Sequence, residues 1–174
     1  YSGNTGSSFG PHVHFEIRDT ETQRVIDPLL YYETLIKDTQ PPIIKGIAVY
    51  PVAAYGVVNN KDIPFRQSLV KLKNGEYSNI DNTISAWGKI GIGINAIDKM
   101  DGTTNVYGVK KVKLLCDGKE IFASDISSFL FEQTRMINSL IDYDYWYRYK
   151  AFYMKSFVEP ANRLPFYKTV DSGY

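Results

Sequence analysis

The sequence has few of the residues that form disulfides or bind transition metals, with one cysteine and two histidines in 174 residues. A single cysteine, Cys116, excludes an intrachain disulfide, and its position in the apolar stretch 112–116 predicts a buried structural thiol. The formal net charge of +1, without basic clusters, gives no electrostatic case for a nucleic acid partner. No apolar run approaches the roughly 18 residues of a transmembrane helix. We therefore expect no nucleic acid partner and no transmembrane segment.

Two adjacent prolines, Pro41 and Pro42, mark a boundary, because proline imposes extended geometry on its neighbours and cannot continue a helix. We predict an amino-terminal segment at residues 1–38 and a second domain at residues 39–174. Since the chain begins with Tyr1 rather than methionine, we expect it to be a piece of a longer protein. We also expect the second domain to be truncated at its carboxyl end, because no closing element follows its last apolar stretch.

The spacing of apolar residues predicts mostly strands after this boundary. Asp117-Gly118 is a strong hairpin signal between two of these strands. In residues 89–97 isoleucine alternates with glycine, which predicts that another backbone or a bulky aromatic side chain covers the glycine face. The expected strands cover residues 11–18, 43–50, 68–73, 89–97, 109–116 and 120–123, with a helical turn within 29–37 and a serine-capped helix over 129–141. Strand number and turn spacing favour a mainly β fold, an immunoglobulin-like or related β-sandwich with a short helical insertion.

Two further patterns in the second domain have a structural and a functional interpretation. The acidic stretch 98–105 lacks the ligand spacing of a calcium loop, so a turn between two strands is favoured. The aromatic cluster 143–153 is rich in tyrosine, and we favour core packing and cover between domains over a platform for sugar rings. An independent carbohydrate-binding module at residues 40–174 remains a third hypothesis for the function.

Both histidines lie in one short motif, Gly-Pro-His-Val-His-Phe-Glu at residues 10–16. In an extended strand His12, His14 and Glu16 share one face, while Val13 and Phe15 share the other. Two imidazoles on one face can form half of a metal site or an acid–base pair, or they can be unrelated surface histidines. They are not enough for a catalytic zinc site, which usually takes three protein ligands and a water.

The stretch from Gly3 to Arg18, followed by Asp27-Pro28-Leu29, resembles the carboxyl-terminal end of the lysostaphin/LytM-type zinc peptidase domain. The resemblance covers residues 3–30. It implies that His14 is a zinc ligand and that His12 acts in acid–base catalysis and polarises the scissile carbonyl. It also implies a Zn²⁺ cofactor, a peptidoglycan peptide substrate, hydrolysis of peptide bonds, and a periplasmic or exported protein of the bacterial cell envelope.

The sequence departs from this family in lacking the upstream zinc ligands of a His-x-x-x-Asp motif and a further catalytic histidine. We therefore expect weak or absent zinc binding and no peptidase activity from this chain alone, with the activity belonging to the longer protein. Without the preceding strands, residues 1–38 either pack on the second domain or are poorly ordered. The alternative function is a non-catalytic LytM-like protein that binds the cell wall or regulates a partner enzyme.

Overall fold

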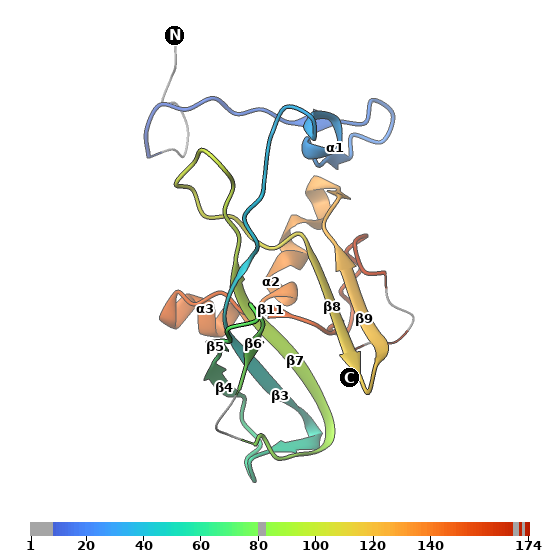
Figure 1. Cartoon of the computed structure of the whole chain (residues 1–174). Helices are drawn as coiled ribbons and strands as arrows, with labels where there is room; N and C mark the ends of the chain where they lie inside the picture. The colour runs from blue at the N-terminus through green and yellow to red at the C-terminus, as the bar shows by residue number, and fades with distance from the viewer. Residues whose placement is uncertain (1–8, 80–82, 169–170, 172) are drawn as a thin grey trace.

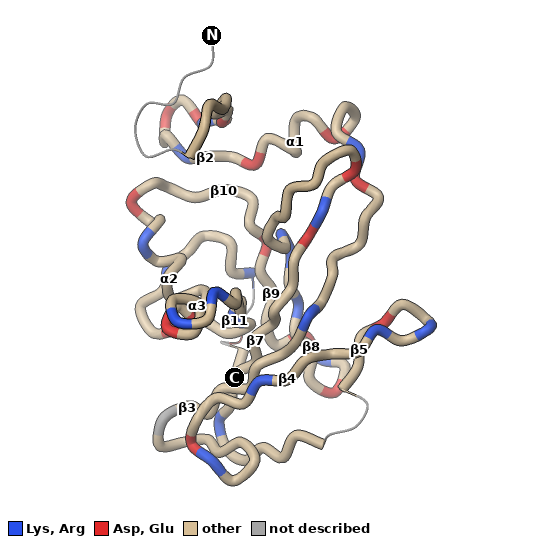
Figure 2. The backbone as a smooth tube through the Cα atoms, turned by 90° about the vertical axis from the view of Figure 1, so that its left-hand side faces the viewer, with Lys and Arg blue, Asp and Glu red and all other residues tan. Residues whose placement is uncertain are grey.

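The computed structural model describes residues 9–79, 83–168, 171 and 173–174. It is mainly β, with 39% strand and 13% helix, and its sheets are antiparallel, as the sequence predicts. Figure 1 shows a long twisted strand pair below, a hairpin beside it and the amino-terminal segment above. Positive and negative side chains are interspersed along the chain (Figure 2). Among the described residues, no helix is long and apolar enough to cross a bilayer.

The largest sheet has four strands in the order β11-β7-β3-β4. Its centre is the pairing of β3 (Ile43–Val58) with β7 (Ala86–Ile97), and β4 (Phe65–Ser68) and β11 (Met154–Lys155) lie at its edges. The predicted strands at 43–50 and 89–97 are therefore confirmed, and both extend further. The expected strand at 68–73 is instead divided between the end of β4 and β5 (Val70–Lys71), which pairs with β6 (Tyr77–Ser78).

The glycine face of β7 is covered by aromatic rings, as the alternating pattern predicts. A Cβ at Gly91 would overlap the ring of Phe157, and a Cβ at Gly93 would come within 2.8 Å of Tyr50 Cε2. The rings of Tyr50 and Phe157 meet edge to face, with centroids 5.6 Å apart. Glycine at these positions thus lets two aromatic side chains approach the sheet backbone.

A hairpin joins β8 (Lys111–Cys116) to β9 (Lys119–Asp125), as Asp117-Gly118 predicts. Both turn residues have positive φ, 49° and 79°, which is typical of a two-residue type I′ turn. The prediction of a buried Cys116 is wrong, because its side chain is exposed. Cys116 pairs with Lys119 at the tip of the hairpin, beyond the part of these strands that the core covers.

The helical part of the second domain begins later than expected. Residues 128–129 form the strand β10 (Ser128–Phe129), and a 3₁₀ helix (Phe131–Met136) and α2 (Ile137–Leu140) follow. The predicted serine cap is therefore wrong, and the Gln133 side chain instead accepts a hydrogen bond from the Leu130 N–H at 2.9 Å. The aromatic cluster forms α3 (Tyr143–Tyr149), which begins where Asp142 Oδ1 accepts from the Tyr145 N–H at 3.2 Å.

The core has two parts. The larger part packs the hairpin against α2 and the carboxyl-terminal segment, and its buried members are Val112, Phe122, Leu140, Ile141, Met154, Leu164 and Phe166. The smaller part lies on the four-stranded sheet and consists of Ala48, Tyr50, Tyr153 and Phe157. Burial of these side chains is the main favourable term for the fold, at about 25 cal/mol per Å² of apolar surface.

The amino-terminal segment packs on the rest of the chain through a small sheet. Its strands β1 (Ile17–Arg18) and β2 (Val25–Ile26) form the order β1-β2-β10, and α1 (Leu29–Tyr32) follows as the expected helical turn. Of the two alternatives for residues 1–38, packing on the second domain is the one observed for the described part, and residues 1–8 lie outside the described residues. The predicted strand over 11–18 is too long, since 13–16 lie outside any strand and only Ile17 and Arg18 pair with β2.

Candidate functional site

The two histidines lie on the exposed stretch of chain that leads into β1. His12 is exposed, and its Nδ1 lies 2.9 Å from the carbonyl oxygen of Gly10. A ring nitrogen this close to a carbonyl oxygen carries the proton in the neutral ring, which leaves the lone pair on Nε2. The residue before the motif's proline therefore fixes which nitrogen of His12 can accept a proton or bind a metal.

His14 is also exposed, with 75% of its side chain accessible to solvent. Its Nε2 lies 3.6 Å from Glu16 Oε2, so these two side chains share one face, as the alternation predicts. The Arg18 guanidinium donates to Glu16 Oε1, with its Nε at 2.7 Å, and lies over the Phe131 ring at 4.5 Å. The hydrogen bond from Arg18 holds the pKa of Glu16 below its usual value, so Glu16 is ionised at neutral pH and faces His14 as a carboxylate.

The neighbouring carboxylates are engaged in local structure rather than turned toward the histidines. Asp19 accepts from the Thr22 N–H and hydroxyl, both at 2.7 Å, and these bonds lower its pKa. Asp27 accepts from the Leu29 N–H at 2.9 Å and pairs with Lys110. Among the described residues, no group of three His, Cys, Asp or Glu side chains is placed to hold a metal ion. Within this part of the chain the histidines are therefore not joined by a third such side chain.

Large apolar side chains near the histidines are exposed. Val13 is 86% exposed and Phe15 is 60% exposed, and these two residues flank His14 in the sequence. Phe15 makes an edge contact with Tyr32, with ring centroids 6.0 Å apart. Leu35 in the following turn is 78% exposed. These exposed apolar side chains thus lie on the same amino-terminal segment as the histidines.

Comparison with protein-family models, with curated proteins and with solved structures finds no match for this chain.

The acidic stretch 98–105 forms a turn, which is the interpretation the sequence favours. Asp98 and Tyr107 exchange two backbone hydrogen bonds of 2.9 Å, and these close the connection between β7 and β8. The Asp101 carboxylate accepts from the Thr39 hydroxyl at 2.9 Å. This bond ties the turn to the residues just before the two prolines.

The aromatic cluster at 143–153 is divided between core and surface. Tyr153 is buried, and Tyr145 packs against it with ring centroids 5.6 Å apart. Tyr143 and Tyr147 stack at 6.4 Å on the exposed side of α3, and Tyr147 is 64% exposed. The packing role that the sequence favours is thus confirmed for part of the cluster, and the sugar platform stays a hypothesis for the exposed rings.

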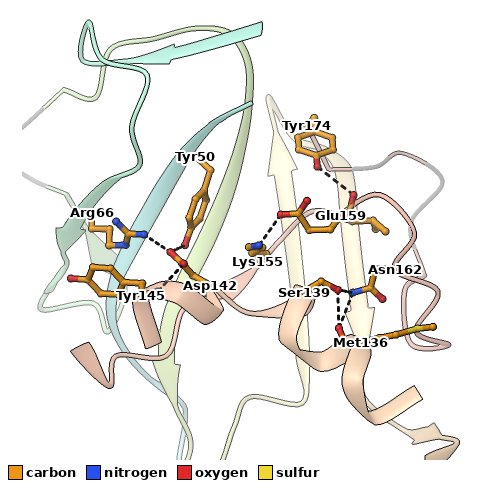
Figure 3. Close-up of polar contacts among 11 residues, drawn as sticks. Tyr50, Arg66, Met136, Ser139, Asp142, Tyr145, Lys155, Glu159, Asn162 and Tyr174 are labelled. Carbon is orange, nitrogen blue, oxygen red and sulfur yellow. Dashed lines mark hydrogen bonds and ion pairs between the residues drawn. The ribbon is translucent and has the colours of Figure 1, made fainter. Parts of the chain in front are cut away.

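No sequence pattern points to Arg66, which the structure places at the centre of a polar and aromatic cluster (Figure 3). Its guanidinium forms an ion pair with Asp142 and lies 3.8 Å from the centroid of the Tyr145 ring. Tyr50 donates its hydroxyl to Asp142 Oδ2 at 3.0 Å. These residues come from β4, α3 and β3, and no local pattern connects them in the sequence.

Proposed function

We propose that this chain is the carboxyl-terminal portion of a lysostaphin/LytM-type zinc metallo-endopeptidase that hydrolyses peptide bonds in bacterial peptidoglycan. Residues 1–38 would form the last part of the catalytic domain, and residues 39–174 an immunoglobulin-like or related β-sandwich as an accessory domain. The protein would act in the cell envelope. The observation that carries the proposal is the exposed pair His12 and His14, with Gly10 and Glu16 positioned to orient the two rings.

The residues of the motif fit separate roles around a zinc ion. His14 would be a ligand, with the Glu16 carboxylate orienting its ring, an arrangement common for metal-bound histidines. Bound zinc supplies an activated water and polarises a carbonyl oxygen. His12, with Nδ1 held by the Gly10 carbonyl, would take up a proton at Nε2 and, once charged, stabilise the developing oxyanion. Arg18 would act through Glu16, because its guanidinium holds that carboxylate in place by hydrogen bonding.

The exposed apolar side chains also support the proposal. In an extended strand Val13 and Phe15 lie on the face opposite the histidines, and both are more than half exposed. A strand of a larger catalytic sheet needs an apolar face of this kind for packing. The missing zinc ligands would then come from the rest of the same catalytic domain in the longer protein. For this chain alone we expect weak zinc binding, because two imidazoles leave most of the coordination shell to water.

Peptidoglycan hydrolysis by the full-length protein, with and without added zinc, tests the proposal. We expect His14→Ala to abolish both activity and stoichiometric zinc, measured by elemental analysis. His12→Ala should abolish activity and keep the zinc. Glu21→Ala is the matched control, since Glu21 is an exposed acidic residue on the same segment, and it should leave activity and zinc unchanged.

Two results would contradict the proposed enzymatic function. A full-length protein that binds peptidoglycan without hydrolysing it would favour a non-catalytic LytM-like protein of the envelope, which binds the wall or regulates a partner. Undiminished hydrolysis by His14→Ala would place the catalytic centre elsewhere in the protein.

A further inference from the structure

A partly open cavity of about 620 Å³ lies where the amino-terminal segment meets the second domain. Residues 25–29 form one wall, and the ends of the hairpin, 107–110 and 126–129, form the other. In Figure 1 this is the region where α1 lies above β8 and β9. Its volume falls in the range of roughly 300–1,000 Å³ that is typical of small-ligand sites. The histidine motif contributes none of the residues that line it.

The walls of the cavity are mostly apolar. The side chains that provide this surface come from both sides of the contact: Ile26, Leu29, Met100, Val109, Ile126 and Phe129. Such walls bind hydrocarbon because burial removes apolar surface from water. The body of a ligand for this site is therefore apolar.

The charged groups of the cavity are predominantly acidic. Asp27 and Lys110 neutralise each other, with Nζ 2.5 Å from Oδ2. Asp38 and Asp98 also line the cavity, and no cationic side chain among the described residues pairs with either. Each uses Oδ1 to accept from a backbone N–H, at 3.1 Å from Gln40 and 2.9 Å from Lys99. Their Oδ2 atoms have no hydrogen-bond donor among the described residues.

From these observations we propose that the cavity binds a small organic cation, an apolar body that ends in a primary ammonium group. The ammonium would be recognised by Asp38 and Asp98, because an ionised donor forms the strongest hydrogen bonds with carboxylates. An anionic ligand of the same shape is disfavoured by the same two carboxylates. The site goes beyond the proposed peptidase function and needs neither zinc nor the histidines, so either idea can fail without the other.

Three probes of one shape separate the contribution of charge from that of apolar burial. We would titrate the ¹⁵N-labelled chain with 4-phenylbutylamine, 4-phenylbutanol and 4-phenylbutyrate and follow the backbone amide shifts. The amine should perturb amides of residues 25–29, 107–110 and 126–129 and bind about tenfold more tightly than the alcohol. The carboxylate should bind more weakly than the alcohol.

Variants of the lining residues identify the groups responsible. The double variant Asp38→Asn, Asp98→Asn should bind the amine no more tightly than the alcohol. Gly108→Phe should abolish binding of all three probes, because a Cβ at Gly108 points into open space and a larger side chain there would fill the cavity. Gly108→Ala is the matched control and should bind the amine as the unaltered chain does, and amide spectra check that each variant is folded.

Several results would overturn the assignment. Equal binding of the three probes would show an apolar cavity without charge recognition, and no binding of the amine would show that the cavity is not a ligand site. An unchanged affinity in the double variant would remove the two aspartates from recognition. Tighter binding of a lysine-containing peptide than of the free amine would assign the cavity to a polypeptide instead.

Discussion

Asp142, the residue that caps α3, forms an ion pair with Arg66 of β4 (Figure 3). Both side chains are mostly buried, with 12% and 19% of their surface exposed. The same carboxylate accepts from Tyr50 and from the Tyr145 N–H, so it connects the helix with two strands of the large sheet. This ion pair attaches α3 to the large sheet, and its burial makes it sensitive to loss of one partner.

Asp142→Ala should lower the free energy of unfolding by about 3 kcal/mol, because it leaves the Arg66 charge buried without its partner. Urea unfolding followed by circular dichroism measures the loss. Asp144→Ala is the matched control, since Asp144 is an exposed acid in the first turn of the same helix, and its loss should be below about 1 kcal/mol. Adding Arg66→Met to Asp142→Ala should recover part of the stability, and equal losses for the two aspartates would contradict this account.

Gly91→Ala should destabilise the chain by about 1–3 kcal/mol, because the added methyl group would overlap the ring of Phe157. Gly108→Ala adds the same group at a position with nothing within 4 Å, so its effect should be slight or stabilising. The difference between the two melting temperatures, measured by calorimetry, tests the packing of β7 against Phe157. Similar melting temperatures for the two variants would show that Phe157 does not lie on the glycine face.

Two tyrosines should respond in opposite ways to loss of the hydroxyl group. The Tyr167 hydroxyl is buried and has no hydrogen-bond partner among the described residues, so Tyr167→Phe should raise the free energy of unfolding at neutral pH by about 1 kcal/mol. The Tyr50 hydroxyl donates to Asp142, so Tyr50→Phe should lower it by about 1–2 kcal/mol. Chemical denaturation of the two variants in parallel gives the comparison, and a loss of stability in Tyr167→Phe would indicate a partner for that hydroxyl.

Stability should fall in alkali between about pH 10 and 12. Burial raises the pKa of Tyr167 to about 12 and also raises the pKa of Tyr50, whereas an unfolded tyrosine ionises near pH 10. Between these values the unfolded chain loses protons that the folded chain retains, so the stabilisation present below pH 10 decreases as the pH rises. Unfolding free energies at pH 9 and pH 11 measure the decrease. This decrease in stability should be smaller in Tyr167→Phe than in the unaltered chain. In Tyr147→Phe it should equal that of the unaltered chain, because the Tyr147 ring is exposed.

The amino-terminal segment should detach more readily when its ion pair with β8 is removed. Lys110→Ala leaves Asp27 without its partner, so amides of β1, β2 and α1 should exchange hydrogen roughly fivefold faster while those of β3 and β7 keep their rates. Hydrogen exchange measured by mass spectrometry resolves these peptides. Lys113→Ala removes an exposed pair with Glu120 and should leave the same amides unchanged. Faster exchange throughout the chain in Lys110→Ala would indicate a global role for that pair.

Features determined by neighbouring residues could be predicted from the sequence. The hairpin at Asp117-Gly118 depends on the φ preferences of two adjacent residues, and the aromatic cover of Gly91 follows from a glycine face that needs a neighbour. The exposure of Cys116 could not be predicted, because an apolar stretch does not show where the core ends along a hairpin. The strand at 11–18 is shorter than predicted because its length depends on a partner strand that spans only Val25 and Ile26.

The candidate sites also differ in how far the sequence alone could predict them. His12, His14 and Glu16 lie in one short motif, so their alternation is visible in the sequence, and the contact between His14 and Glu16 follows from it. Arg66 and the cavity depend on residues that come together only through the tertiary fold. Lys110 and Asp27, for example, are 83 positions apart. No periodicity within a short window carries such information.

The pairing of Ile26 with Ser128 has a consequence for the order in which the chain folds. The β3–β7, β8–β9 and β1–β2 pairs each close a comparatively short loop, whereas the pairing of β2 with β10 joins strands that lie before and after the first two of these pairs. Closing a long loop costs more conformational entropy and slows the contacts that require it. We therefore expect the pairing of β2 with β10 to form last during refolding, after the completed core has positioned β10.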